Sequence, residues 1–174
     1  QLSAALPLQR ILICDPYADA EAATRLSAQC GVSVSFAQAE EAVAAADIIV
    51  TASRSTTPLF PGAIVKPGTF IAAIGSSLPH TRELDDVALS RASAVVVEWR
   101  PQSLREAGDL VLADKAVLPD EKILELADVL LDTAPTRKHA DDILIYKSVG
   151  VGLEDVALAG IAYQRITAAQ AAAA

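Results

Sequence analysis

The sequence predicts an α/β fold in which a doubly wound, mostly parallel sheet is covered by helices. Two observations carry this prediction. Apolar runs of strand length alternate along the chain with segments of helical character. Most of these runs are continuously apolar, which is typical of strands buried on both faces. The 174 residues are enough for one domain with a real core.

The elements are expected in a regular order. Residues 1–6 resemble the end of a helix that Pro7 stops. Strands are expected over 10–14, 32–36, 48–51, 69–74 and 94–98, and in the apolar run after Asp142. Helices are expected from Asp19 to Gly31 and over 40–46, 84–92, 102–107, 120–131 and 151–166. The clearest helical pattern is 120–131, where four apolar residues recur at helical spacing.

Composition excludes several classes of function. The net charge of −8, without a cluster of Lys or Arg, argues against a nucleic-acid partner. The sequence shows no apolar run that could cross a bilayer and no secretory signal, so we expect a cytoplasmic protein without a membrane partner. Cys14, Cys30, His80 and His139 have no metal-binding spacing, so no metal site is expected. Cys14 closes an apolar strand and is expected in the core.

Polar turns follow four of the predicted strands. The carboxyl ends of parallel strands meet at the ligand-binding edge of an open α/β sheet. Small residues there let a cofactor approach the backbone, and hydroxyls can donate to phosphate or ribose, although each turn alone is ordinary turn chemistry. Together they predict a dinucleotide site that contains Asp15, Thr51, Ala52, Ser53, Gly75, Ser76, Lys147, Ser148, Val149 and Gly150.

Asp15 favours NAD over NADP. An acid that closes the second strand of a Rossmann-like unit accepts hydrogen bonds from the ribose hydroxyls and repels a 2′-phosphate. The alternative is a turn-forming Asp before Pro16. A glycine-rich loop normally lies ~20 residues before such an acid, and this chain starts too late to include that loop or its strand. We therefore expect a gap with unpaired backbone. Either this chain is part of a longer polypeptide, or the sheet rearranges or borrows a strand from a neighbour.

His80 is a candidate proton donor in the loop beyond Ser77, because the pKa of histidine lies near neutrality. The alternative is a plain polar loop residue. Glu154 and Asp155, in the first turn of the last helix, most simply complement the helix dipole.

The chain resembles the ornithine cyclodeaminase/mu-crystallin family in motifs that run in family order. The specific matches are Lys66-Pro67-Gly68-Thr69 with Ala73-Ile74-Gly75, Pro79 with Arg82-Glu83-Leu84-Asp85, and Tyr146-Lys147-Ser148-Val149-Gly150 with Leu153-Glu154-Asp155. Further matches are Ala46-Asp47-Ile48-Ile49-Val50-Thr51-Ala52, which is common to many nucleotide-binding units, and Glu106-Ala107-Gly108-Asp109-Leu110.

The resemblance implies that residues 1–150 form part of an NAD(P)-binding Rossmann domain. It implies that residues 151–174 form a helix that packs on a substrate and dimerisation domain outside this chain, so a homodimer or an exchange of strands or helices between copies is expected. It also implies that the turn 147–150 faces the nicotinamide, that Asp15 faces the adenosine ribose, and that residues 51–53 lie near the dinucleotide.

The resemblance also bears on the reaction. In true ornithine cyclodeaminases, the loop after the fifth strand carries an aspartate that handles the amine and water. Aligning Gly75, Pro79 and Glu83 with that motif places Ser77 where the aspartate would be. A serine cannot act as a carboxylate base, so the resemblance favours the ketimine reductase branch.

The expected function is therefore the NAD(P)H-dependent reduction of a cyclic imino acid, such as 1-pyrroline-2-carboxylate, with Ser77 and His80 beside the imine. The alternatives are an ammonia-releasing cyclodeaminase with catalytic NAD, an enzyme like alanine dehydrogenase, and a non-catalytic ligand binder. The 174 residues alone are expected to be inactive and to bind the cofactor weakly or not at all.

Overall fold

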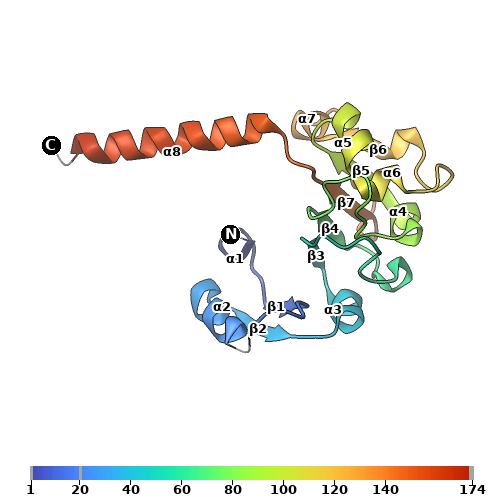
Figure 1. Cartoon of the computed structure of the whole chain (residues 1–174), viewed down its shortest axis with the longest axis horizontal. Coiled ribbons are helices and arrows are strands. Elements are labelled where there is room, and N and C mark those ends of the chain that lie inside the picture. Colours follow the sequence, from blue (N-terminus) through green and yellow to red (C-terminus); the bar gives the residue numbers. More distant parts are fainter. Residues whose placement is uncertain (1, 20, 173–174) are drawn as a thin grey trace.

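All strand pairs among the described residues are parallel, which confirms the predicted α/β class. The computed structural model describes residues 2–19 and 21–172, so the predictions for Gln1 and for residues 173–174 lie outside it. A five-stranded sheet has the order β3-β4-β7-β5-β6, and β1 and β2 form a separate pair (Figure 1). The strands are β1 Arg10–Ile13, β2 Ser33–Phe36, β3 Ile48–Thr51, β4 Phe70–Ala73, β5 Ala92–Val97, β6 Ile123–Glu125 and β7 Ile143–Lys147.

Helices connect most of these strands. They are α1 Leu2–Ala5, α2 Ala22–Cys30, α3 Ala39–Ala45, α4 Asp86–Arg91, α5 Arg100–Glu106, α6 Gly108–Val111, α7 Leu126–Leu130 and α8 Gly152–Ala172, with 3-10 turns η1 Gly62–Ile64 and η2 Asp120–Lys122. Gly31 ends α2 in the left-handed conformation at φ 68°, as the sequence predicts. Asp85 begins α4, because its carboxylate accepts a hydrogen bond from the Ala88 N–H.

The core lies around the five-stranded sheet. Ile71, Val95, Val97 and Ile145 are fully or almost fully buried, and apolar side chains from the connecting segments pack against them. Burial alternates along β3, β4 and β7, so that one face of these strands is closed while the other is partly open. Val50, on the second face, is 48% exposed. Full burial of both faces, as the sequence predicts, is thus reached only in β5, where five of six residues are buried.

Two local predictions are wrong. Residues 120–131 are not one helix, but the turn η2, the strand β6 and the short helix α7. Residues 123–125 pair in parallel with residues 95–97 of β5, so tertiary pairing overrides the helical spacing of the apolar residues. Cys14 is exposed rather than in the core, because it follows the end of β1 in a sheet of only two strands.

The expected gap in the sheet is present. Within the described residues, β1 pairs only with β2, and β3 pairs only with β4. The two sheets stand apart in Figure 1. Each of β1 and β3 therefore leaves one backbone edge without a strand partner.

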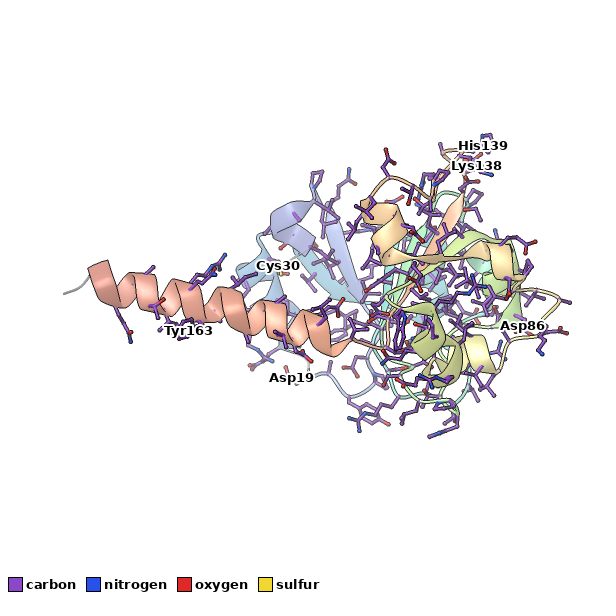
Figure 2. The ribbon with its side chains drawn as sticks, turned by 90° about the horizontal axis from the view of Figure 1, so that it is seen from above. Asp19, Cys30, Asp86, Lys138, His139 and Tyr163 are labelled. Atoms are coloured by element: carbon purple, nitrogen blue, oxygen red, sulfur yellow. The ribbon has the colours of Figure 1, made fainter. Side chains whose placement is uncertain are left out.

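Helix α8 projects away from the rest of the molecule in both views (Figures 1 and 2), with Tyr163 far from the sheets. Its large apolar side chains are exposed, namely Leu153, Val156, Leu158, Ile161, Tyr163 and Ile166. They point in several directions around the helix rather than along one stripe. No helix among the described residues is long and apolar enough to cross a membrane.

Candidate functional site

The carboxyl ends of four strands form one edge of the five-stranded sheet. Thr51, Ala73, Lys147 and Val97 lie in one row across β3, β4, β7 and β5. The structure thereby brings together the three predicted turns that follow β3, β4 and β7, here called the carboxyl edge. Asp15 follows β1 and lies on the separate two-stranded sheet.

A fully buried carboxylate, Glu83, ties two of these turns together. Its Oε1 accepts hydrogen bonds from the N–H of Ser53 at 2.6 Å and from the Ser53 hydroxyl at 2.8 Å. Its Oε2 accepts from the Thr51 hydroxyl at 2.9 Å, the Gly75 N–H at 2.9 Å and the Ser76 N–H at 3.2 Å. Glu83 therefore connects the end of β3 with the end of β4.

The third turn is anchored by a buried ion pair. Lys147 Nζ lies 3.3 Å from Asp109 Oδ2, in an ion pair without good hydrogen-bond alignment, and donates to the Ala73 carbonyl at 2.9 Å. Asp109 Oδ1 accepts the backbone N–H groups of Glu83 at 2.7 Å and Leu84 at 2.8 Å. Burial lowers the pKa of Lys147, and the nearby carboxylate of Asp109 opposes that shift.

These contacts restrict how the predicted cofactor residues can act. The side chains of Thr51, Ser76 and Lys147 are buried and already bonded within the protein. A ligand at this edge can contact these three residues only through their backbone atoms. Ala52 and Gly150 are exposed, and Ser53, Gly75, Ser148 and Val149 are half-buried.

A second carboxylate, Glu98, holds the turn after β7. It follows the end of β5 and accepts the N–H groups of Val149 at 3.4 Å and Gly150 at 3.2 Å. Gln102 Nε2 donates to the Gly150 carbonyl at 3.2 Å. Burial, with the neighbouring Glu98 charge, raises the pKa of Tyr146 to about 12.

Gly150 gives this turn its shape. It has a φ of 78°, which favours glycine, and no heavy atom lies within 4 Å of the position that a Cβ would take. The backbone of the turn after β7 is therefore open to an approaching ligand.

Ser77 and His80 lie together on one exposed loop. Thr81 closes this loop, since its N–H and its hydroxyl both donate to the Leu78 carbonyl, at 3.0 and 2.8 Å. Gly108, at the start of α6, packs so tightly below the loop that a Cβ there would overlap the carbonyl of Thr81. The loop is therefore held firmly while Ser77 and His80 face solvent.

A cleft of about 500 Å³ lies at the carboxyl end of the two-stranded sheet. Asp15 lines it together with apolar groups that include Ile13, Pro16, Phe36 and Ala37. An exposed carboxylate beside apolar walls matches the chemistry of an adenosine. The ribose hydroxyls can donate to the carboxylate, and the base can pack against the apolar walls. The residues present thus fit the adenosine end of a dinucleotide.

Sequence reasoning gave no role to Glu98, Gln102 or Asp109, and treated Glu83 only as part of a motif. A signal existed for Glu98, because it ends a strand at the ligand edge, as Asp15 does. The partners of Glu83 and Asp109 are separated from them by up to 38 residues in the sequence, so no local pattern could reveal these contacts.

The chain belongs to the ornithine cyclodeaminase/mu-crystallin family, whose sequence pattern matches residues 2–170. It is 36% identical over 124 residues to ketimine reductase mu-crystallin of Mus musculus, which covers 71% of this chain and 37% of the relative. This confirms the family predicted from the motifs.

Solved structures of this family share the fold. A probable ornithine cyclodeaminase from Bordetella pertussis Tohama I is 60% identical, with a TM-score of 0.92, over 96% of this chain and 54% of that one. Thermococcus litoralis Delta(1)-pyrroline-2-carboxylate reductase, in complex with NADH and L-proline, is 26% identical, with a TM-score of 0.84, over 92% of this chain and 50% of that one. The present chain thus spans about half the length of these structures and less of the curated relative.

Proposed function

We propose that this chain is the dinucleotide-binding part of an oxidoreductase that reduces cyclic imino acids, of the ketimine or 1-pyrroline-2-carboxylate reductase type. The observation that carries the proposal is the carboxyl edge, where open backbone lies next to a loop that presents Ser77 and His80 but no carboxylate. The likeness to relatives named as imine reductases, one of them with NADH and L-proline, supports the same class.

The proposed cofactor is NAD(H). Asp15 would accept from the adenosine ribose hydroxyls, and the cleft around it would hold the base. The backbone of the turns after β4 and β7 would line the rest of the dinucleotide site, with Ala52 and Ser53 nearby. When bound, the reduced nicotinamide supplies a hydride to an imine carbon.

Ser77 and His80 are the proposed substrate-facing residues. Reduction of C=N to CH–NH adds a hydride at carbon and a proton at nitrogen. The exposed imidazole of His80 would hold that proton, and the Ser77 hydroxyl would hydrogen-bond the imine or its carboxylate. Glu83 is not available for proton transfer, because five hydrogen bonds engage its buried carboxylate.

The proposed activity belongs to the native polypeptide that carries this sequence, acting as a homodimer in which the apolar surface of α8 is covered. The 174 residues alone are proposed to give no turnover and to bind NADH weakly, because they match only about half of their solved relatives.

An ammonia-releasing cyclodeaminase is the second candidate, because the structure with 60% identity is named a probable ornithine cyclodeaminase. Ser77 argues against it, since a hydroxyl cannot replace a carboxylate base. An enzyme like alanine dehydrogenase and a non-catalytic binder are further alternatives that retain the same cofactor edge.

Turnover separates these candidates. The native polypeptide is incubated with NADH and 1-pyrroline-2-carboxylate, and separately with L-ornithine and NAD. We expect loss of NADH absorbance with the imine and no ammonia from ornithine. Ammonia release without imine reduction would replace the proposal by the cyclodeaminase, and binding without either reaction would favour the non-catalytic binder.

A further inference from the structure

We propose that Glu83 is the positioning residue of the carboxyl edge, and that its ionised carboxylate sets the shape of the turns on which a dinucleotide rests. The functional half of this inference rests on the proposed function. The structural half rests on the hydrogen bonds of Glu83 alone.

The carboxylate cannot be replaced by a neutral group of the same shape. Each of its oxygens accepts a backbone N–H, from Ser53 on one side and from Gly75 and Ser76 on the other. A glutamine amide would place its own N–H groups against one of these donors in either orientation. A buried N–H without an acceptor is costly, so the site requires an acceptor on both sides.

The segment around Glu83 also holds the loop after β3. The Glu83 carbonyl accepts the N–H of Leu59 at 2.9 Å, and the N–H of Arg82 donates to the Ser55 carbonyl at 2.7 Å. Gly75 lies so close to Ser53 and to the Glu83 carboxylate that a Cβ there would overlap both. The ends of β3 and β4 thus form a single closely packed unit with Glu83 between them.

The third turn joins the same unit through charge. Asp109 accepts the Glu83 and Leu84 N–H groups and pairs with Lys147, whose neighbour Ser148 begins the turn after β7. The Lys147 cation thus pairs with Asp109 and also attracts the nearby Glu83 charge, which limits the cost of burying these carboxylates. Loss of the Glu83 charge would therefore disturb β3 and β4 directly, and β7 only through Asp109.

The test compares Glu83→Gln with Asp85→Asn. Asp85 is a matched control two residues away, because its two oxygens also accept backbone N–H groups, from Ala88 at 2.7 Å and Gly62 at 2.9 Å. Its substitution should destabilise the fold without touching the carboxyl edge. Amide hydrogen exchange is measured on isotope-labelled wild-type and variant chains. NADH affinity is taken from the shifts of the Asp15 and Ser148–Gly150 amides during titration of the native polypeptide that carries each sequence.

We expect Glu83→Gln to lower the protection of the Ser53, Gly75 and Ser76 amides by about fivefold or more. We expect NADH affinity to fall by about tenfold. Asp85→Asn should lower the melting temperature while leaving these amides and the affinity unchanged. Thr51→Val, which removes one donor to Oε2, should give a smaller loss in the same direction and serves if Glu83→Gln fails to fold.

Unchanged NADH affinity in Glu83→Gln, despite lost protection, would overturn the positioning role. An equal loss of affinity in Asp85→Asn would do so as well, since general destabilisation would then explain both. If the wild-type native polypeptide shows no NADH-induced shift, the proposed cofactor site fails instead. The structural claim is then judged by hydrogen exchange alone. It holds if the Ser53, Gly75 and Ser76 amides lose protection in Glu83→Gln and Thr51→Val but not in Asp85→Asn. It is overturned if these amides keep their protection in Glu83→Gln and Thr51→Val.

Discussion

At the scale of single residues, the carboxyl edge is built from buried charges rather than from the hydroxyls that the sequence brings to attention. Thr51 and Ser76 were predictable at the carboxyl edge because they lie at the ends of predicted strands. Their inward orientation was not, because the Thr51 hydroxyl donates to Glu83, 32 residues later in the chain, and the Ser76 hydroxyl donates to the carbonyl of Thr81. Spacing reveals which residues reach an edge, but not which way their side chains turn.

Lys147 offers a stability test at this scale. Lys147→Met should lower the free energy of unfolding by about 3–5 kcal/mol, because it leaves the buried Asp109 carboxylate without its cation. Denaturant unfolding measures this loss. The double variant Lys147→Met/Asp109→Asn should recover part of it, since asparagine keeps one oxygen for the Glu83 and Leu84 N–H groups. A Lys147→Met chain as stable as wild type would contradict the buried ion pair.

Tyr146 provides a pH-dependent test. Its pKa in the folded chain is raised from the ordinary 10 to about 12, so the folded state holds the phenol proton more tightly than the unfolded state. This contribution to stability is complete below pH 10 and is lost as the pH rises towards about 12. The difference in tyrosinate absorbance between wild type and Tyr146→Phe should titrate at about 12. Titration of this difference near 10 in a folded chain would refute the buried setting beside Glu98.

At the scale of elements, most strands and helices were predictable because apolar runs and turn residues mark them locally. The failure at residues 120–131 has a physical cause. A three-residue strand is too short to show a period, and β6 exists because β5 offers it an edge. The helical spacing of Ile123 and Leu130 therefore suggested that both lie on one face of a single helix, whereas Ile123 lies in β6 and Leu130 in α7.

A pair of substitutions tests this correction. Ile123 is 4% exposed in β6, and Leu130 is 76% exposed in α7. Ile123→Ala should cost about 2–5 kcal/mol in free energy of unfolding. Leu130→Ala should cost no more than about 0.5 kcal/mol. Similar large costs for both, measured by denaturant unfolding, would favour the single amphipathic helix instead.

At the scale of the whole molecule, two features lack a partner among the described residues. These are the strand edges of β1 and β3 on either side of the gap, and the exposed helix α8. The sequence predicted the gap, and predicted that the last helix would pack on a domain outside this chain. The apolar pattern alone did not predict what covers the apolar surface of α8, because a helix with apolar groups on all sides does not indicate a single partner face.

Truncation of α8 tests its role. A chain that ends at Val151 should keep the melting temperature of the longer chain, since α8 projects away from both sheets (Figure 1). The 174-residue chain should self-associate through the exposed apolar groups, and the truncated chain should be monomeric, as measured by light scattering after gel filtration. A monomeric 174-residue chain would argue against α8 as an interface between copies.

The central claim is that the carboxyl edge of the five-stranded sheet, with the cleft at Asp15, is a dinucleotide site. Amide shifts of the labelled native polypeptide that carries this sequence, followed during NADH titration, test it most directly, because they report binding residue by residue. We predict shifts in residues 15–18, 51–53, 75–77 and 148–150, and none in residues 136–142 at the opposite edge of the sheet. Shifts at that opposite edge alone, or at no residue up to millimolar NADH, would contradict the claim.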